Sequence, residues 1–253
     1  SMTILQSLVL GIVQGLTEFL PVSSSGHLVL FESWFGITQS GIIFEVLLHA
    51  ATLGAVFVFF YPALRKLRLP KIGLLLLASI PAALVGILFK SQIESLFNSV
   101  VVVACALLVT AGVNFGISYY LRRERAVAVT KKSALFIGVL QALAIMPGIS
   151  RSGSTIFAGL KSGLSRQQAF EFSFLLSIPA IGGAMLLQVL AVVTEGAVFP
   201  SVGPMVVGFV AAFLTGLASL SLLKKLLVTN HFSLFGWYAA TLAAVVLAFE
   251  FIG

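Results

Sequence analysis

Apolar residues without an intervening charge dominate the chain and divide it into long windows. Covering the hydrocarbon core of a bilayer takes about 20 apolar residues, because an α-helix rises 1.5 Å per residue. Each window therefore predicts one membrane-spanning helix. The six windows are 46–64, 72–89, 95–121, 172–194, 196–223 and 232–249.

Two further apolar segments are interrupted by polar and helix-breaking residues. The first covers 3–31 and is broken at Pro21, by three serines and at Gly26; the second covers 133–160 and is broken at Pro147 and Gly148. Each half is too short to cross a bilayer alone, and a break in lipid leaves backbone groups unpaired unless protein or a water-filled cavity surrounds it. We therefore predict two re-entrant helix–loop–helix hairpins, at about 3–31 and 133–160.

Composition supports a membrane location. Apolar residues make up 59% of the 253 residues and charged residues only 9%, too few to cover a water-soluble domain of this size. Cys105 is the single cysteine, so an intramolecular disulfide is excluded. The net charge is +7, but the basic residues form no stripe interleaved with aromatic residues. Nucleic acid is therefore not an expected partner.

The lysines and arginines cluster on one predicted side of the membrane. Eleven of the 15 follow the first, third and fifth windows, and Lys90 alone lies on the other side. The remaining three, Arg151, Lys161 and Arg166, lie in the second re-entrant region. Because cytoplasmic loops are enriched in Lys and Arg, we predict that the basic segment 122–132 is a cytoplasmic linker. The first hairpin and the C-terminus are then expected to face outward.

The two halves of the chain contain an internal repeat. The stretch beginning at Gly11 parallels the one beginning at Gly138 at an offset of 127 residues, and Gln14 then matches Gln141. Each repeat, 2–121 and 133–253, holds one hairpin and three spans. An odd number of crossings inverts the second repeat relative to the first, an arrangement typical of transporters. The predicted fold is an all-α polytopic membrane protein with six transmembrane helices and two re-entrant hairpins whose polar tips converge.

The two tips carry the candidate chemistry. Gln14 and Glu18 are four residues apart and share a helix face, and the following turn offers His27 and the hydroxyls of Ser23, Ser24 and Ser25. A carboxylate suits a divalent cation or acid–base work, and His27 could act as nucleophile, base or acid.

The second tip has the character of an anion site. Arg151 offers a planar guanidinium suited to phosphate oxygens. Its neighbours supply hydroxyl groups: Ser150, Ser152, Ser154 and Thr155. An arginine anchored at the interface is the alternative interpretation.

Structural interpretations compete with functional ones elsewhere. The three serines at the first tip could simply satisfy freed backbone groups, and His49 favours a packing or helix-bridging role. His231 is expected in a solvated loop, and Glu45 is more apt than Glu171 to border the site. Gly182 and Gly183 predict close helix packing, and the many phenylalanines predict a lipid-facing surface.

The two tips together resemble the signature motifs of the undecaprenyl pyrophosphate phosphatase family, the bacitracin-resistance phosphatases of bacterial inner membranes. The first motif is matched by Gln14, Glu18, Pro21, Val22, Ser23, Ser24, Gly26 and His27. The second is matched by Pro147, Gly148, Ser150, Arg151, Ser152, Gly153 and Thr155. The similarity extends over essentially the whole chain.

The resemblance implies removal of the terminal phosphate from a C55 isoprenoid pyrophosphate, with Mg²⁺ or Ca²⁺ as cofactor. It implies that Glu18 and Gln14 bind the cation or a water, that Ser24 and His27 are nucleophile and acid–base partner in one order or the other, and that Arg151 grips the pyrophosphate.

The implied substrate clamp also includes the hydroxyl-bearing residues Ser23, Ser25, Ser150, Ser152 and Thr155. Gln14 stands where relatives often have a carboxylate, and a neutral amide cannot act as a base. The implied location is the inner membrane with a site opening to the periplasm, among membrane lipids, and a homodimer is a candidate assembly. A transporter or flippase for polyprenyl phosphate is the alternative function, suggested by the repeat.

Overall fold

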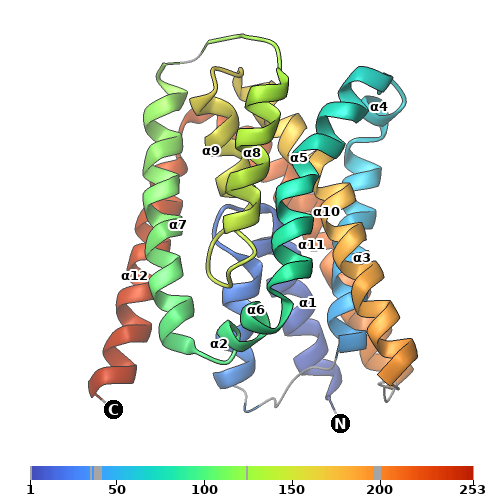
Figure 1. The fold of residues 1–253 in the computed structure, drawn as a ribbon. Helices are drawn as coiled ribbons and strands as arrows, with labels where there is room; N and C mark the ends of the chain where they lie inside the picture. The colour runs from blue at the N-terminus through green and yellow to red at the C-terminus, as the bar shows by residue number, and fades with distance from the viewer. Residues whose placement is uncertain (1, 35, 37–41, 124, 196–200, 253) are drawn as a thin grey trace.

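The computed structural model describes residues 2–34, 36, 42–123, 125–195 and 201–252. These residues form helices and turns, and no strand occurs among them. The helices are Ile4–Phe19 (α1), Ser24–Trp34 (α2), Ile42–Phe59 (α3), Tyr61–Leu64 (α4), Leu69–Leu88 (α5), Lys90–Leu96 (α6), Val100–Leu121 (α7), Lys131–Leu143 (α8), Arg151–Lys161 (α9), Arg166–Glu195 (α10), Val202–Thr229 (α11) and Phe232–Ile252 (α12). Figure 1 shows the long helices running side by side.

One long helix corresponds to each predicted window. Five of them (α5, α7, α10, α11 and α12) are long and apolar enough to cross a membrane, and α3 is a slightly shorter apolar helix beside them. The chain is therefore a multi-pass, all-helical membrane protein.

Several predicted helix ends are wrong. The window 196–223 begins in residues outside the described part, and α11 continues to Thr229, because Lys224 and Lys225 lie on the helix instead of ending it. The window 95–121 includes the end of α6, and α7 begins only after Ser99, whose hydroxyl accepts from the Val102 amide. Charge marks where the membrane core ends, whereas a helix can continue into the interface.

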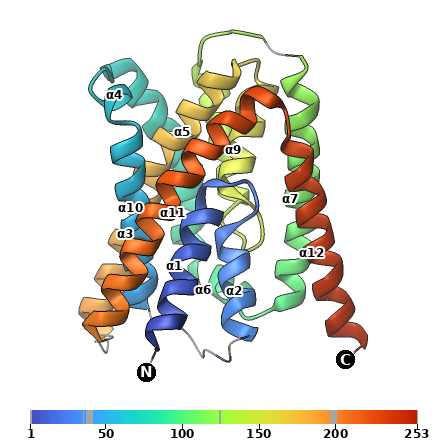
Figure 2. The same cartoon turned by 180° about the vertical axis from the view of Figure 1, so that it is seen from behind.

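Two helix–turn–helix hairpins lie among the long helices, as predicted. Figures 1 and 2 show α1–α2 rising from the end of the molecule that carries both termini and α8–α9 descending from the opposite end. The tips touch: a methyl group added at Gly26 would lie 3.0 Å from the Gly148 Cα.

The hairpins begin with the same cap at equivalent repeat positions. Thr3 caps α1 and Thr130 caps α8, 127 residues apart. In each capping box the threonine hydroxyl accepts from the third helical amide, while that residue's side chain accepts from the threonine amide. The cap also corrects one boundary, because Lys131 and Lys132 of the predicted linker 122–132 form the first turn of α8.

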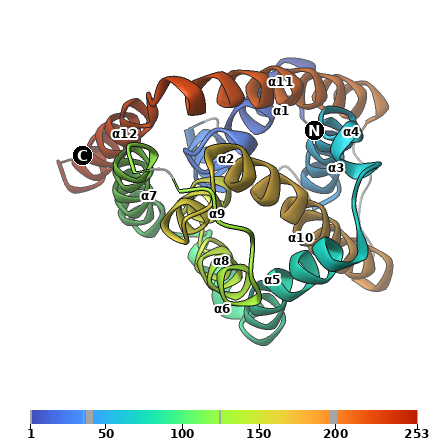
Figure 3. The same ribbon diagram turned by 90° about the horizontal axis from the view of Figure 1, so that it is seen from above.

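Each hairpin packs against a helix of the other half. Figure 3 shows α1 along α11 and α8 along α5. Glycines permit this approach: a Cβ at Gly15 would lie 2.4 Å from the Ala212 carbonyl oxygen, and one at Gly138 would lie 2.4 Å from that of Ala78. The prediction for Gly182 and Gly183 is wrong, because a Cβ at either would meet nothing within 4 Å among the described residues.

Aromatic rings fill much of the interior. Phe19 of α1 packs edge-on against Phe174 of α10 at 5.6 Å between ring centroids, and Phe174 also contacts Phe60 and Phe170. These four side chains are buried. The expectation that the phenylalanines form a lipid-facing surface is therefore wrong for this cluster, which joins the first hairpin to the helices behind it.

Candidate active site at the two hairpin tips

The first tip is a tight turn between α1 and α2. Ser23 adopts φ +73°, a left-handed conformation that is uncommon for a residue other than glycine. Its hydroxyl accepts from the Gly26 amide at 3.3 Å and so caps the start of α2. The turn places Ser24 at the first position of α2 and His27 one turn further on.

The second tip has the same serine cap before α9, although Ser150 is extended with φ −71° where Ser23 is left-handed. The Ser150 hydroxyl accepts from the Gly153 amide at 3.1 Å, as the Ser23 hydroxyl does at the first tip. Gly148 has φ +96°, and a Cβ there would lie 2.4 Å from the Val103 carbonyl oxygen. Glycine is therefore required for this tip to lie against α7.

Two buried side chains of α7 hold the tips in place. The Thr110 hydroxyl donates to the Gly148 carbonyl at 2.7 Å and accepts from the Ser150 amide at 2.9 Å. One turn on, Asn114 donates through Nδ2 to the Pro21 carbonyl at 2.6 Å. Sequence reasoning missed both residues, although two polar side chains four positions apart in a charge-free span were a usable signal.

Glu18 and Arg151 bring the two tips into direct contact. Glu18 Oε1 accepts from Arg151 Nη2 at 2.9 Å, and their side chains are only 7% and 15% exposed. The other oxygen, Oε2, accepts from the Ser24 hydroxyl at 2.6 Å and from Gln14 Nε2 at 3.2 Å. A carboxylate, a guanidinium and a hydroxyl thus meet at one buried point, as the predicted convergence of the tips requires.

His27 has different partners from those expected of a serine–histidine pair. Its Nδ1 lies 2.7 Å from the Ser23 carbonyl oxygen, and its Nε2 lies 2.7 Å from the Tyr238 hydroxyl of α12. A carbonyl only accepts, so Nδ1 carries the proton in the neutral ring and Nε2 accepts from Tyr238. Among the described residues, Ser24 is hydrogen-bonded to Glu18 and not to His27.

The remaining hydroxyls at the tips are hydrogen-bonded, and their residues are buried except for Ser25, which is half-buried. Ser23 contacts Ser25 at 3.3 Å between hydroxyls, and Ser150 contacts Ser152 at 3.2 Å. The Thr155 hydroxyl donates to the Arg151 carbonyl at 2.9 Å. These contacts give the five residues a structural role, and substrate binding by them stays a prediction.

Four other polar residues occupy distinct environments. His49 contacts the Glu45 carbonyl at 2.8 Å through Nδ1 and lies within electrostatic range of Glu18. Glu171 pairs with Lys71 and so joins α10 to α5. His231 is exposed between α11 and α12, as predicted.

The hairpin tips offer few protein ligands for a divalent cation. No group of three or more His, Cys, Asp or Glu side chains capable of holding a metal occurs among the described residues. Gln14 Oε1, however, is buried and has no hydrogen-bond partner among the described residues, and Nε2 of the same amide donates to the Glu18 carboxylate. One carboxylate and one free amide oxygen fit a Mg²⁺ ion that takes its other ligands from phosphates and water.

Comparison with known proteins covers nearly the whole chain. Residues 7–245 match the family model for bacitracin resistance protein BacA. A protein of Methanosphaera stadtmanae is 37% identical over 96% of this chain and 97% of its own length. One of Pelotomaculum thermopropionicum is 41% identical over 98% and 97%, and one of Carboxydothermus hydrogenoformans is 38% identical over 98% of both. All three relatives are named undecaprenyl-diphosphatase. The chain belongs to the BacA bacitracin resistance protein family.

Proposed function

We infer that the chain is an undecaprenyl-diphosphatase, which hydrolyses undecaprenyl diphosphate to undecaprenyl phosphate and inorganic phosphate. The observation that carries this function is the contact of the two hairpin tips through Glu18, Ser24 and Arg151. This reaction regenerates the lipid carrier. It is consistent with the description of the family as bacitracin resistance proteins.

Arg151 is the residue that we propose to bind the diphosphate. Its guanidinium is paired through Nη2 with Glu18, while Nη1 is buried and has no partner in the described part of the chain. A phosphate oxygen that accepts from Nη1 would form the charge-assisted hydrogen bond that this atom lacks. Positive charge at this point stabilises the negative charge that develops on the transferred phosphoryl group.

Ser24 is the nucleophile in this proposal, and Glu18 accepts its proton. The 2.6 Å hydrogen bond from the Ser24 hydroxyl already points that proton at Glu18 Oε2. As the bond from Oγ to the terminal phosphorus forms, the bond from phosphorus to the bridging oxygen breaks, and undecaprenyl phosphate leaves as an anion. Water then attacks the phosphoserine and loses a proton to His27 Nε2. The bond from phosphorus to Ser24 Oγ breaks, Glu18 returns its proton to Oγ, and inorganic phosphate leaves.

Glu18 and Gln14 are the groups that we propose to hold a Mg²⁺ or Ca²⁺ ion. Bound there, the cation would neutralise phosphate charge. The chain's own contribution is to place one carboxylate and one amide oxygen beside Arg151.

We propose that the basic end of the molecule lies in the cytoplasm and that the first hairpin opens to the periplasm of an inner membrane. Replacing Cys105 with serine allows single cysteines to be labelled in cells with a maleimide that does not cross membranes. Ser33→Cys, at the exposed end of α2, should react from outside, and Val127→Cys, in the exposed basic linker, only after lysis. The reverse pattern would invert the orientation.

Phosphate release from a defined lipid tests the proposed activity. The purified protein, reconstituted with undecaprenyl diphosphate and Mg²⁺ or Ca²⁺, should release inorganic phosphate, and His27→Ala and Arg151→Ala should not. His231→Ala, which changes an exposed loop histidine, is the matched control and should retain activity. Absence of release by the wild-type protein with every cation would refute the function.

Transport of polyprenyl phosphate is the second candidate, favoured by the approach of the hairpins from opposite ends of the molecule. Fluorescent polyprenyl phosphate in sealed vesicles would become inaccessible to an external quencher if the protein moves it. Arg151→Ala should stop both activities if they share one site.

A further inference from the structure

Tyr238 lies outside both sequence motifs but contacts the site directly. It is carried by α12, which packs along α7, and its side chain reaches His27. The Tyr238 and His27 rings are stacked at 5.7 Å between centroids with 7° between their planes. The hydroxyl–Nε2 distance of 2.7 Å is that of a well-formed hydrogen bond.

We propose that Tyr238 is a positioning residue for His27, an inference that rests on the proposed phosphatase function. Two contacts fix the imidazole, one at each nitrogen: the Ser23 carbonyl at Nδ1 and the Tyr238 hydroxyl at Nε2. The Ser23 carbonyl selects the tautomer, and Tyr238 sets the direction of the basic nitrogen.

A hydroxyl suits this position because His27 changes protonation during turnover. The phenol donates to Nε2 while the ring is neutral and accepts from Nε2–H once the ring is protonated. An ammonium or an indole can only donate. The contact persists when His27 becomes protonated if the phenol oxygen accepts the proton from water as its own proton passes to Nε2, and the ring then stays oriented through both steps of the reaction.

Tyr238→Phe tests this role because it keeps the ring and removes the hydroxyl. Losing one neutral hydrogen bond should lower kcat about fivefold with little change in KM. Diethyl pyrocarbonate, which modifies unprotonated histidine nitrogens, supplies a readout independent of activity. His27 in Tyr238→Phe should be modified about fivefold faster than in wild type, measured by mass spectrometry of its peptide.

Internal and matched controls accompany this measurement. Modification of the exposed His231 should not change, and Trp237→Phe, an exposed neighbour on α12, should leave both kcat and His27 reactivity as in wild type. Equal His27 reactivity and equal kcat in wild type and Tyr238→Phe would overturn the proposal. If His27 is modified faster in Tyr238→Phe but the wild-type protein hydrolyses no diphosphate, the contact between Tyr238 and His27 is supported and the phosphatase function is refuted.

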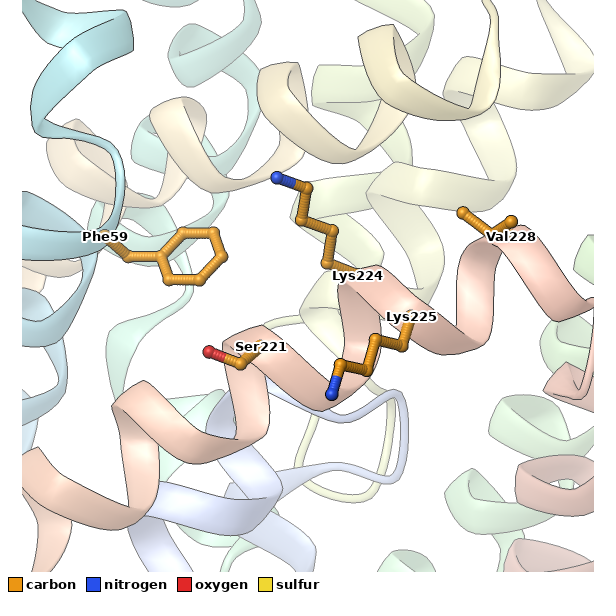
Figure 4. Close-up of a pocket in the computed structure, with 5 residues that line it drawn as sticks. All are labelled: Phe59, Ser221, Lys224, Lys225 and Val228. Atoms are coloured by element: carbon orange, nitrogen blue, oxygen red, sulfur yellow. The ribbon is translucent and has the colours of Figure 1, made fainter.

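A second inference comes from a separate pocket at the basic end of the molecule. The pocket measures about 450 Å³ and lies between α3 and α11, where it is lined by Phe59, Ser221, Lys224, Lys225 and Val228. Figure 4 shows Ser221 and Lys224 extending from α11 toward the space beside the Phe59 ring. It contains none of the hairpin-tip residues.

Charge and apolar surface around the pocket match one kind of ligand. Neither Lys224 nor Lys225 forms a salt bridge with any residue in the described part of the chain. On the same helix, Val206, Val210 and Leu214 are exposed at four-residue spacing, and they form an apolar stripe that ends about 10 Å before Ser221. Lys224 Nζ lies 6.0 Å from the centroid of the Phe59 ring, which leaves its charge available to an anion. Two lysines without an ion pair above an apolar stripe complement a lipid with an anionic headgroup.

We propose that this pocket binds an anionic glycerophospholipid of the leaflet at the basic end. The headgroup phosphate lies between Lys224 and Lys225 and accepts from the Ser221 hydroxyl, while the acyl chains follow the stripe on α11.

Native mass spectrometry of the detergent-purified protein tests this site with phosphatidylglycerol and phosphatidylcholine as probes. Wild type should retain phosphatidylglycerol preferentially, and the double variant Lys224→Gln/Lys225→Gln should bind it about 30-fold more weakly. The matched control is Lys131→Gln/Lys132→Gln, another exposed lysine pair, on the first turn of α8. Equal losses in the two double variants, or equal retention of both lipids by wild type, would overturn the proposal.

Discussion

Replacing Glu18 with glutamine should remove both the charge that pairs with Arg151 and the proton acceptor of Ser24. The carboxylate accepts three hydrogen bonds, from Arg151, Ser24 and Gln14. Glutamine keeps the shape of the side chain but removes its charge and its ability to accept the Ser24 proton. General bases contribute about 10²- to 10⁴-fold to rate, so we expect Glu18→Gln to lower kcat at least 10³-fold. Phosphate release from undecaprenyl diphosphate measures this loss.

The same variant should also destabilise the protein, because it leaves the Arg151 guanidinium buried without a carboxylate. Breaking a buried pair by removing one partner costs about 3–5 kcal/mol. The double variant Glu18→Gln/Arg151→Gln removes both charges and should recover a large part of that loss, as measured by thermal unfolding in detergent. No recovery in the double variant would mean that the pair does not couple the two tips.

Gln14→Ala is the matched comparison. It removes the 3.2 Å hydrogen bond to Glu18, worth about 1.5 kcal/mol, and one neutral ligand of the proposed cation. At saturating cation, kcat should therefore fall only about tenfold. Equal losses of activity in Glu18→Gln and Gln14→Ala would refute the assignment of the proton acceptor to Glu18 alone.

Three further changes test how the tips are held. Gly148→Ala should cost more than about 2 kcal/mol and most of the activity, because the new methyl would meet the α7 backbone at a positive φ. Gly112→Ala, whose Cβ would meet no described residue within 4 Å, should be neutral or slightly stabilising in the same unfolding assay. Asn114→Ala should cost about 1–3 kcal/mol and reduce activity, since the Pro21 carbonyl loses its buried donor; wild-type stability in this variant would contradict the role of α7. Lys71→Met should shift the midpoint of thermal unfolding only slightly, because its pair with Glu171 is partly exposed.

The sequence predicted the arrangement of the hairpins better than the partners within the site. Apolar windows, two broken segments and a repeat of 127 residues were enough to predict hairpin tips that meet between the long helices. The same pattern could not show which way each polar side chain turns. Ser24 and His27 are three positions apart on α2, yet one contacts α1 and the other α12.

Residues that support the site from outside the motifs could not be recognised from local patterns. Thr110 and Asn114 lie in an otherwise apolar span, and Tyr238 resembles an aromatic residue at the membrane interface. Their roles depend on long-range contacts: α7 approaches both tips, and α12 lies beside α7. The predictions of lipid-facing phenylalanines and of close packing at Gly182 and Gly183 were wrong for a related reason. Composition does not show which face of a helix is covered by its neighbours.

The contact between Glu18 and Arg151 also suggests how the site remains stable before substrate arrives. An isolated guanidinium at this depth would carry a large desolvation cost, and the Glu18 carboxylate offsets its charge. An incoming diphosphate supplies negative charge of its own and, in the proposed reaction, accepts from Nη1 while Nη2 keeps its pair with Glu18. The guanidinium would then hold the phosphate beside the Ser24 hydroxyl, which is hydrogen-bonded to Glu18. The two hairpins would therefore contribute different parts of the proposed site: the second binds the headgroup, and the first supplies the nucleophile and its proton acceptor.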